Sequence, residues 1–239
     1  MQHVLITGAG RGIGLELARQ YAERGDRVLA GCRDIERAPG LSALVDQRRD
    51  QVSVLPLEVT DAASLTDAVQ QAHRAVEGLD ILINNVAINP GDVTVEGPDG
   101  QRLLDDTRTL EVFNINVVAP VRVAQAFTSL LTHGTAPRVI NISSGAGSLT
   151  YATDGGDGYS YAASKAALNM MTRTYAWTVR DQGITAVMID PGWVKTDMGG
   201  AGADLAPEES GRGLLAVIDG LMPEDTGRFL RYDGSEVPW

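Results

Sequence analysis

Hydrophobic and polar residues follow two alternating periods along this chain of 239 residues. Short apolar runs are bounded by Gly, Asp and Asn, which is typical of buried strands. The expected strands are residues 4–7, 27–31, 52–59, 79–84, 138–143, 185–189 and, at an edge, 227–232. Between them apolar residues recur every three or four positions, as on one face of a helix. The expected helices are residues 13–24, 61–76, 107–131, 159–181 and 207–221.

This alternation of strands and helices predicts an α/β fold, a doubly wound parallel sheet with helices on both faces. No internal repeat, linker or low-complexity tract divides the sequence, so we expect a single domain over residues 1–239. Segments rich in Gly, Pro or other small residues are expected to be irregular. These segments are residues 89–106, 145–158 and 198–204.

Composition and charge exclude several classes of function. The chain has 20 basic and 31 acidic residues, and this net charge of −11 argues against nonspecific binding to nucleic acid or anionic membranes. No segment approaches the run of about 18 apolar residues that a membrane span needs. Cys32 is the only cysteine, and His3, His73 and His133 are scattered, so neither an internal disulfide nor a metal site is expected. The N-terminus enters a strand directly, which together with the single cysteine predicts a cytoplasmic protein.

A glycine run lies between the first strand and the first helix. It does not fit the spacing G-x-G-x-x-G, because Ile13 occupies the third glycine position. It does fit T-G-x-x-x-G-x-G, with Thr7, Gly8, Gly12 and Gly14. Glycines at these positions let the backbone approach a phosphate at a helix N-terminus, whose free amides favour anions. The alternative is a glycine turn with a structural role only.

Tyr161 and Lys165 are four residues apart on an expected helix, so they are neighbours on one face. This spacing alone is weak, since many exposed helix pairs share it. Lysine usage adds to it, because Lys165 and Lys195 are the only lysines among the 20 basic residues. Lysine provides a compact charge with an adjustable pKa, whereas arginine stays protonated. A phenol beside an ammonium group, combined with a dinucleotide cradle, predicts hydride transfer at a carbonyl group.

Several motifs occur in one order along the chain: residues 7–14, Asn84-Asn85-Val86-Ala87, Asn116, Ser144, Tyr161 with Lys165, and Pro191-Gly192. In this order the chain resembles the short-chain dehydrogenase/reductase family over nearly its whole length. Within the family it is most similar to the C-factor/sniffer-type carbonyl reductases, through residues 31–34, 116–120 and 232–234. The resemblance implies a Rossmann-type sheet, with the cofactor part mainly in residues 1–120 and the substrate and catalytic part mainly in 116–239.

The resemblance also implies four catalytic residues. Tyr161 would exchange a proton with the substrate oxygen, and Lys165 would stabilise the phenolate and hold the nicotinamide ribose. Ser144 would bind the substrate oxygen, and Asn116 would support a water relay to Lys165. Alignment with the family selects Ser144 over Ser143, which is expected to be a packing residue, and Asn116 over Asn114, a helix-surface or capping residue.

The cofactor contacts that the resemblance implies are spread over the loops that follow the strands. They are Gly8, Arg11, Gly12, Ile13, Gly14, Arg33, Glu58, Val59, Asn85, Ala87, Tyr161, Lys165, Pro191, Gly192, Val194 and Thr196. The chain departs from the family in three ways. Val86-Ala87 replaces Ala-Gly, Glu58 replaces the usual Asp near the adenine, and the stretch from Ser144 to Tyr161 is longer than usual.

The end of the second strand indicates which dinucleotide is bound. An NAD site usually has a carboxylate there for the ribose hydroxyls, whereas this chain has Cys32 followed by Arg33. Arg11 lies in the nearby glycine run, and two guanidinium groups can bind a 2′-phosphate through charge-assisted hydrogen bonds. Each Arg could instead be a solvated surface charge, and Asp34 is a nearby carboxylate. We expect NADP(H).

The expected function is NADPH-dependent reduction of a ketone or aldehyde, with Tyr161 as the general acid/base. Two alternatives are an NAD(P)-dependent alcohol dehydrogenase working oxidatively and a cofactor-sensing signalling or regulatory protein on the same fold. The expected partner is a small carbonyl or alcohol substrate, without nucleic acid or membrane, and both a homodimer and a homotetramer are left open. Expected walls of the substrate pocket are residues 86–91, 148–159 and 193–204, with Leu149, Tyr151, Trp193 and Met198.

Overall fold

Seven parallel strands form the centre of the molecule in the computed structural model, which describes residues 1–91, 94–152 and 158–239. In sheet order the strands are β3 (Val52–Pro56), β2 (Arg27–Cys32), β1 (His3–Thr7), β4 (Ile81–Asn84), β7 (Arg138–Ile142), β8 (Thr185–Asp190) and β9 (Phe229–Arg231). Every neighbouring pair is parallel. This confirms the expected doubly wound parallel sheet.

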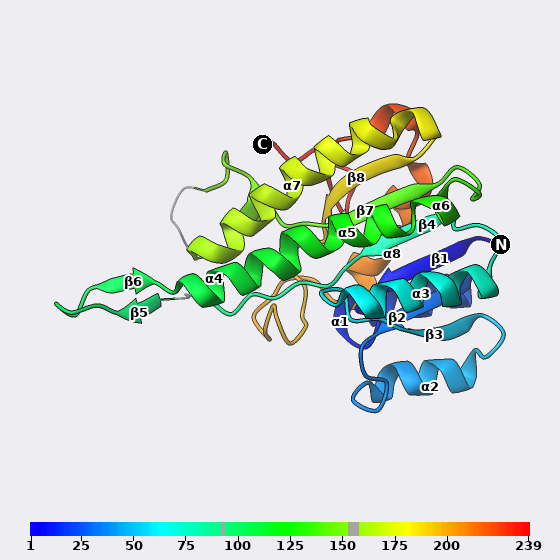
Figure 1. The fold of residues 1–239 in the computed structure, drawn as a ribbon, viewed down its shortest axis with the longest axis horizontal. Helices are drawn as coiled ribbons and strands as arrows, with labels where there is room; N and C mark the ends of the chain where they lie inside the picture. Colours follow the sequence, from blue (N-terminus) through cyan, green and yellow to red (C-terminus); the bar gives the residue numbers. More distant parts are fainter. Residues whose placement is uncertain (92–93, 153–157) are drawn as a thin grey trace.

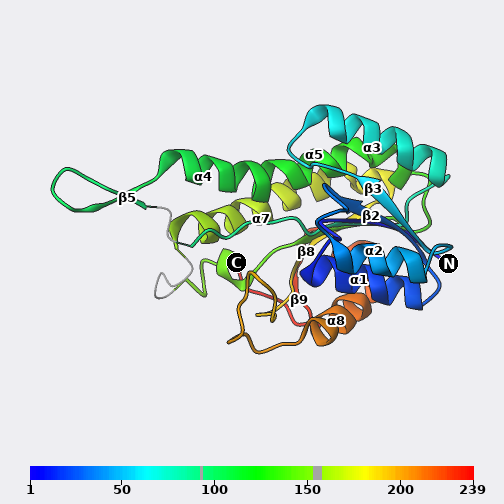
Figure 2. The ribbon, with the colours of Figure 1, turned by 90° about the horizontal axis from the view of Figure 1, so that it is seen from below.

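Helices cover both faces of this sheet (Figures 1 and 2). One face carries α1 (Gly12–Glu23), α2 (Pro39–Gln47) and α8 (Pro207–Gly220). The other carries α3 (Ala62–Ala75), α5 (Ala119–Ala126), α6 (Thr128–Leu131) and α7 (Tyr159–Val179). The helices on the two faces enclose two hydrophobic cores, the first under α1, α2 and α8 and the second under α3, α5, α6 and α7. Within β1, Val4 and Ile6 pack into the first core and Leu5 into the second. The strands are therefore buried on both sides, which is why they are continuous apolar runs in the sequence.

The order of the strands fixes where a ligand can bind. The chain builds outward from β1 to β2 and β3, then returns to place β4 on the other side of β1. Crossovers therefore leave β1 and β4 in opposite directions. In open α/β sheets, ligands bind beyond the carboxyl ends of the strands at such a switch point.

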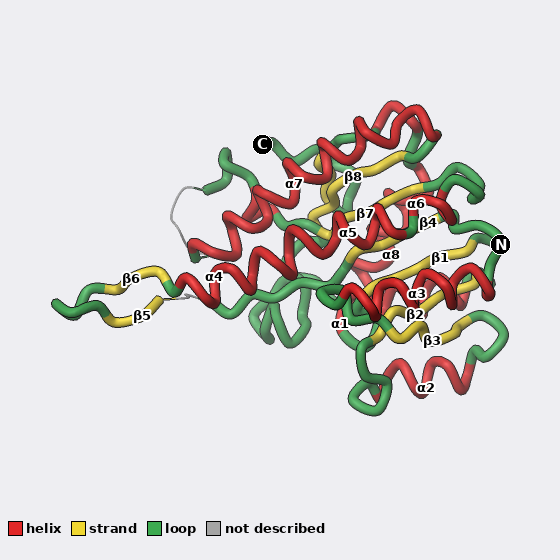
Figure 3. The backbone as a smooth tube through the Cα atoms, viewed as in Figure 1, coloured by secondary structure: helices red, strands yellow, loops and turns green. Residues whose placement is uncertain are grey.

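The secondary structure, coloured in Figure 3, differs from the expectation in the region before the fifth expected strand. The single expected helix of residues 107–131 consists of α4 (Asp106–Phe113), a π-helical turn at Asn114–Val118, α5 and α6. The expected loop of residues 89–106 contains an antiparallel hairpin, β5 (Thr94–Glu96) with β6 (Arg102–Leu104), which projects from the body in Figure 1. Residues 92–93 of that loop lie outside the described residues.

Three smaller differences concern residues 33–59 and 145–158. Helix α2 was not predicted, because only Leu41 and Leu44 of its nine residues are buried. Strand β3 ends at Pro56 rather than at residue 59. The expected irregular segment of residues 145–158 begins with a 3-10 helix, Gly145–Gly147, and its residues 153–157 lie outside the described residues.

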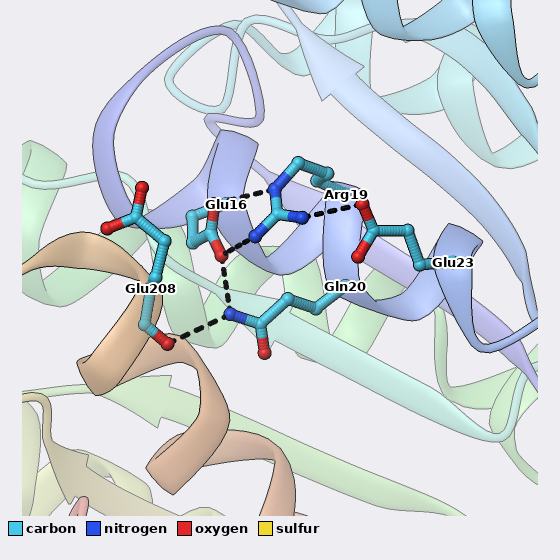
Figure 4. A network of polar contacts seen from close by, with 5 residues as sticks. All are labelled: Glu16, Arg19, Gln20, Glu23 and Glu208. Atoms are coloured by element: carbon cyan, nitrogen blue, oxygen red, sulfur yellow. Dashed lines mark hydrogen bonds and ion pairs between the residues drawn. The ribbon is translucent and has the colours of Figure 1, made fainter.

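A polar network joins α1 to α8 (Figure 4). Glu16, on α1, is only 7 % exposed. Its carboxylate accepts hydrogen bonds from Arg19 and Gln20, and Gln20 Nε2 also donates to the carbonyl of Glu208, 3.1 Å away. The buried carboxylate is thus paired, and the network holds the start of α8 against α1.

Three further observations concern chemistry outside the strand ends. Among residues 1–91, 94–152 and 158–239, no helix is long and apolar enough to cross a membrane. The same residues contain no cluster of three or more His, Cys, Asp or Glu side chains that could hold a metal ion. Cys32 is buried at the end of β2.

Phe127, which lies between α5 and α6, tests the second core. It is fully buried, so Phe127→Ala should lower the free energy of unfolding by about 3–5 kcal/mol, because it removes apolar contacts and leaves a cavity. Urea unfolding measures this. Leu110→Ala is the control, since Leu110 is 69 % exposed and its change should stay within about 0.5 kcal/mol. Equal losses for the two variants would contradict this description of the core.

Candidate active site

The residues expected at the site come together along one edge of the sheet, beyond the carboxyl ends of the strands. Five belong to the turn after β1 and the first residues of α1, and the others follow β2, β3, β4, β7 and β8 or lie on the helices next to them. Parallel strands make this convergence possible, because all their carboxyl ends lie at the same edge.

The turn after β1 can accept an anion. Gly8 and Gly12 have φ values of +68° and +56°, in the left-handed region that favours glycine. A Cβ on Gly14 would lie 2.4 Å from the carbonyl oxygen of Gly8, so only glycine permits this close turn. Helix α1 begins at Gly12, and the side chain of its N-cap residue Arg11 makes no capping hydrogen bond to the helix amides. The first amides of α1, including that of Ile13, can therefore bind a phosphate.

Asn85, directly after β4, braces this turn. Its Nδ2 donates to the carbonyl oxygens of Thr7 and Gly8 at 3.1 and 3.3 Å, and its backbone amide donates to Thr7 Oγ1 at 3.0 Å. The side-chain amide therefore stabilises the cradle, and a direct cofactor contact of Asn85 or Ala87 stays a prediction. Val86 fits beside Gly8, where a Cβ would lie 3.0 Å from Val86 Cγ2.

Ser144 and Lys165 both lie near the end of β7. Ser144 is the N-cap of the 3-10 helix, and its Oγ accepts the amide of Ala146 at 3.2 Å. Lys165 projects from α7 and its Nζ donates to the carbonyl oxygen of Ile142, the last residue of β7, at 2.9 Å. The ring centroid of Tyr161, one turn earlier on α7, is 5.6 Å from Nζ. A phenol, an ammonium group and a hydroxyl thus border the same strand end.

Burial sets the protonation of Lys165. Its side chain is 2 % exposed, and this desolvation lowers its pKa to about 8, although the negative charge of Asp190 opposes the shift. The ammonium form remains the main species at neutral pH, while deprotonation begins within the mildly alkaline range.

Close packing holds α7 against the turn that carries Ser144. A Cβ on Gly147 would lie 2.8 Å from the backbone carbonyl carbon of Lys165, so the helix can approach only a glycine there. Ser143 is buried and its Oγ donates to Asn169 Oδ1 at 2.6 Å, while Asn169 Nδ2 donates to the carbonyl of Gly147 at 3.4 Å. Ser143 is therefore a packing residue, as predicted, and Asn169 adds support that the sequence did not indicate.

Asn116 lies fully buried in the π-helical turn. Its Oδ1 accepts the amide of Ile88, and its Nδ2 donates to the carbonyl of Ile88, both at 2.9 Å. Nδ2 also donates to Ser164 Oγ at 3.0 Å, and Ser164 donates to the carbonyl of Tyr161 at 2.7 Å. Asn116 thus links the segment after β4 to the turn of α7 that bears Tyr161. Its role in a water relay stays a prediction, and Asn114 is exposed at the end of α4, as expected.

The two arginines expected at a 2′-phosphate are each paired with a carboxylate. Arg33 Nη1 is 3.1 Å from Glu58 Oε2, and Arg11 Nη1 is 2.8 Å from Asp197 Oδ2. Both guanidinium side chains are largely exposed, so these pairs are weak and can exchange partners. Partial burial opposes ionisation of Glu58, but hydrogen bonds from Thr60 and Arg33 outweigh it and lower the Glu58 pKa.

The loop after β8 lies against the glycine turn. Gly192 has a φ of +76°, and a Cβ on Gly12 would lie 3.4 Å from Thr196 Cγ2. Val194 is buried and forms a bridge with Leu205. Segment 198–204, expected to be irregular, is closed off by backbone hydrogen bonds that join residues 193 and 195 to 205. The loop therefore has a defined shape beside the cradle, with Pro191 buried at its start.

The expected walls of the substrate pocket are the least enclosed part of the site. Leu149, Tyr151, Trp193 and Met198 are all exposed. Tyr151 Cδ2 lies 3.7 Å from the position of a Cβ on Gly145, so Tyr151 is close to the Ser144 turn. Val59, expected among the cofactor contacts, is buried. Residues 153–157 of the expected wall lie outside the described residues.

Asp190 is a site-edge residue that the sequence analysis missed. It ends β8 and is 8 % exposed, directly before Pro191-Gly192. The available signal was a carboxylate directly after the apolar run of residues 186–189, a position at which a buried charge requires a partner.

Comparison with known proteins agrees with the fold and the motifs. Residues 2–204 match the family model described as short chain dehydrogenase, and the chain belongs to this family. The protein named C-signal from Myxococcus xanthus is 45 % identical over 166 residues, which are 67 % of this chain and 93 % of that protein. The NADPH-bound carbonyl reductase from chicken fatty liver has a TM-score of 0.90 and 36 % identity, covering 100 % of this chain and 99 % of that one. The carbonyl reductase Sniffer of D. melanogaster has a TM-score of 0.90 and 30 % identity, covering 100 % of both chains.

Gly147 provides a test of the packing behind the site. Gly147→Ala should lower the free energy of unfolding by about 1–3 kcal/mol, because the new methyl group collides with the backbone of Lys165. Gly220→Ala is the matched control, since a Cβ there meets no atom within 4 Å, and stability should be unchanged or slightly raised. Chemical denaturation of both variants decides, and a fully stable Gly147→Ala protein would disprove the close approach.

Proposed function

We propose that the chain is an NADPH-dependent carbonyl reductase that converts a ketone or aldehyde to an alcohol. The observation that carries this proposal is the pair of Tyr161 and Lys165 on α7, with Lys165 bonded to the end of β7 two residues before Ser144. Membership of the short-chain dehydrogenase family and the likeness to two carbonyl reductases support it.

Each of the three polar groups has a distinct task in this proposal. Tyr161 donates its hydroxyl proton to the substrate oxygen, and Ser144 orients that oxygen by a hydrogen bond. The phenolate that remains is stabilised by the nearby Lys165 ammonium group. When bound, NADPH supplies the hydride that reduces the carbonyl carbon. The same residues support alcohol oxidation in reverse.

The residues that hold the cofactor are also part of the proposal. The free amides at the start of α1 suit the pyrophosphate, and Arg11 and Arg33 suit the 2′-phosphate. No carboxylate stands at Cys32, where NAD sites usually have one. Lys165 would hold the nicotinamide ribose and Thr196 the carboxamide. The chicken carbonyl reductase, which is similar over the whole chain, has NADPH bound.

A signalling or regulatory role on the same fold is the second candidate. It is favoured by the 45 % identity to the protein named C-signal. Oxidation of NADPH with a panel of ketones and aldehydes separates the two, because a cofactor-sensing protein would bind NADPH without turnover. Absence of turnover with a broad panel would favour the second candidate.

Replacing Tyr161 tests proton donation. Tyr161→Phe should lower turnover by about 10²–10⁴-fold while NADPH binding stays nearly unchanged, since only the hydroxyl group is lost. Tyr159→Phe is the matched control, because Tyr159 lies on the same turn of α7 but is 77 % exposed. Steady-state rates and fluorescence titration measure the two effects. Wild-type turnover in Tyr161→Phe would exclude the mechanism.

Arg33 tests the choice of cofactor. Arg33→Ala should weaken NADPH binding by about 1.5–3 kcal/mol, the range for hydrogen bonds to charged groups, and should leave NADH binding almost unchanged. Arg49→Ala is the control, because Arg49 is equally exposed and also paired with a carboxylate, Asp46. Calorimetric titration with both cofactors is suitable. Equal losses for NADPH and NADH would show that Arg33 does not bind the 2′-phosphate.

A further inference from the structure

Residues 148–152, called the wall segment below, carry two exposed side chains at the edge of the site, Leu149 and Tyr151. Tyr151 Cδ2 lies 3.7 Å from the position of a Cβ on Gly145, the first residue of the 3-10 helix. Ser148 shapes the segment locally, because it is buried and its Oγ accepts the amide of Tyr151 at 3.3 Å. The position of this segment therefore determines the shape of the substrate side of the site.

Trp239 contacts the wall segment from a distant part of the chain. The backbone oxygen of Trp239 accepts two hydrogen bonds from Thr150, one from its amide at 3.0 Å and one from its hydroxyl group at 2.6 Å. The two residues are 89 positions apart in the sequence. Thr150 lies between Leu149 and Tyr151, so this contact holds the exposed part of the wall segment.

The indole ring of Trp239 is in turn held between two elements of the body. Its centroid lies 6.0 Å from that of Phe229, on β9, and the two rings are inclined at 44°. The guanidinium carbon of Arg173, on α7, lies 4.9 Å from the centroid of the indole. Both arrangements are attractive. Because Phe229 is only 1 % exposed, the indole rests on a rigid surface.

The chain after β9 brings Trp239 to this place. Residues 235–237 turn back along β9, and the amide of Val237 donates to the carbonyl of Phe229 at 2.9 Å. Val237 is 2 % exposed and packs with Phe229 and Met188 in a small core cluster. The position of Trp239 is therefore fixed by the sheet, and its backbone oxygen connects the wall segment to that fixed point.

We infer that Trp239 is a positioning residue for the proposed carbonyl reduction, which holds the wall segment in place and so determines the affinity for substrates with bulky apolar groups. The inference rests on the proposed function for its catalytic meaning. Proton transfer stays with Tyr161 and Lys165, so Trp239 acts on substrate binding through Leu149 and Tyr151. A merely structural role makes a different prediction, because a loss of folded protein lowers the activity equally for every substrate.

Hydrogen exchange tests the contact without any substrate. Trp239→Ala removes the contacts of the indole with Phe229 and Arg173, so the backbone at position 239 is no longer held against the wall segment. Exchange of the amides of residues 150–152, followed by mass spectrometry, should become about tenfold faster or more, because local opening controls it. Trp239→Phe keeps an aromatic ring at this position and should restore most of the protection.

Trp177 provides the matched control for the removal of an indole. It lies on α7, is 53 % exposed, and its ring centroid is 5.3 Å from the guanidinium carbon of Arg180. Trp177→Ala therefore removes a similar pair of side chains away from the wall segment. It should leave the exchange of residues 150–152 unchanged.

Steady-state kinetics with two substrates of different size tests the consequence for binding. The substrates are the bulkiest aryl ketone and the smallest aliphatic aldehyde that the wild-type protein reduces. For the aryl ketone, Trp239→Ala should raise KM by about fivefold or more and leave kcat within about twofold, because binding contacts are lost while proton transfer is retained. For the aldehyde, which is too small to contact the wall segment, both constants should be unchanged.

A second variant approaches the same contact from the wall segment and leaves Trp239 in place. Thr150→Val removes the hydroxyl hydrogen bond to the Trp239 backbone oxygen. It should change exchange and the KM of the aryl ketone in the same direction as Trp239→Ala, by a smaller factor. Thr178→Val is its control, because Thr178 is also exposed and its hydroxyl donates to the carbonyl of Thr174 within α7, 3.0 Å away. Neither quantity should change in that control.

The outcomes separate this inference from the proposed function. Unchanged exchange of residues 150–152 in folded Trp239→Ala and Thr150→Val proteins would overturn the inference, and so would an equal rise in KM for both substrates. If the wild-type protein reduces no carbonyl compound, the proposed function fails, and the exchange measurement still decides whether Trp239 holds the wall segment. If the wild-type protein is active and the exchange does not change, the inference alone fails.

Discussion

The close approach of backbone at the junction of β1 and β4 is the constraint on which the site depends. Gly14 lies so near the Gly8 carbonyl that a methyl group there would be only 2.4 Å from the oxygen. Asn85 then uses its amide to hold the carbonyls of Thr7 and Gly8. Any side chain at position 14 would push α1 off the strand and misdirect the amides that face an anion. The cradle thus depends on glycines directly after β1 and on the hydrogen bonds that Asn85, directly after β4, donates to the same turn.

A second constraint arises from placing an amine where water is excluded. Burial disfavours a charged Lys165, but the carbonyl of Ile142 accepts a hydrogen bond from its Nζ, and the negative charge of Asp190 opposes the fall in its pKa. Both partners are available only if α7 lies directly against the end of β7, and the missing side chain of Gly147 permits this. The protonation of Lys165 therefore depends on the position of α7 against the end of β7.

The sequence predicted the sheet well because strands buried on both faces are continuous apolar runs. The motif residues follow the carboxyl ends of these strands, whereas their roles stay predictions. The sequence did not predict the elements that are only partly buried, or the contacts between residues that are far apart in the chain. Helix α2 buries two leucines, and the β5–β6 hairpin lies away from the core, so neither leaves a clear pattern. The sequence did not indicate the network around Glu16, because Gln20 links it to the Glu208 carbonyl, which is distant in sequence. Asp190 was missed because the groups around it come from separate segments of the chain. The single-domain assignment stays a prediction.

The strand order also governs the sequence of events during folding. Asn85 and Thr7 are 78 positions apart, so the glycine turn cannot be braced until β4 has crossed the strands already formed. Parallel pairing of this kind closes long loops before any contact compensates, which slows folding. During synthesis the first three strands therefore emerge with an unbraced turn. The anion cradle becomes complete only when the fourth strand docks against the first.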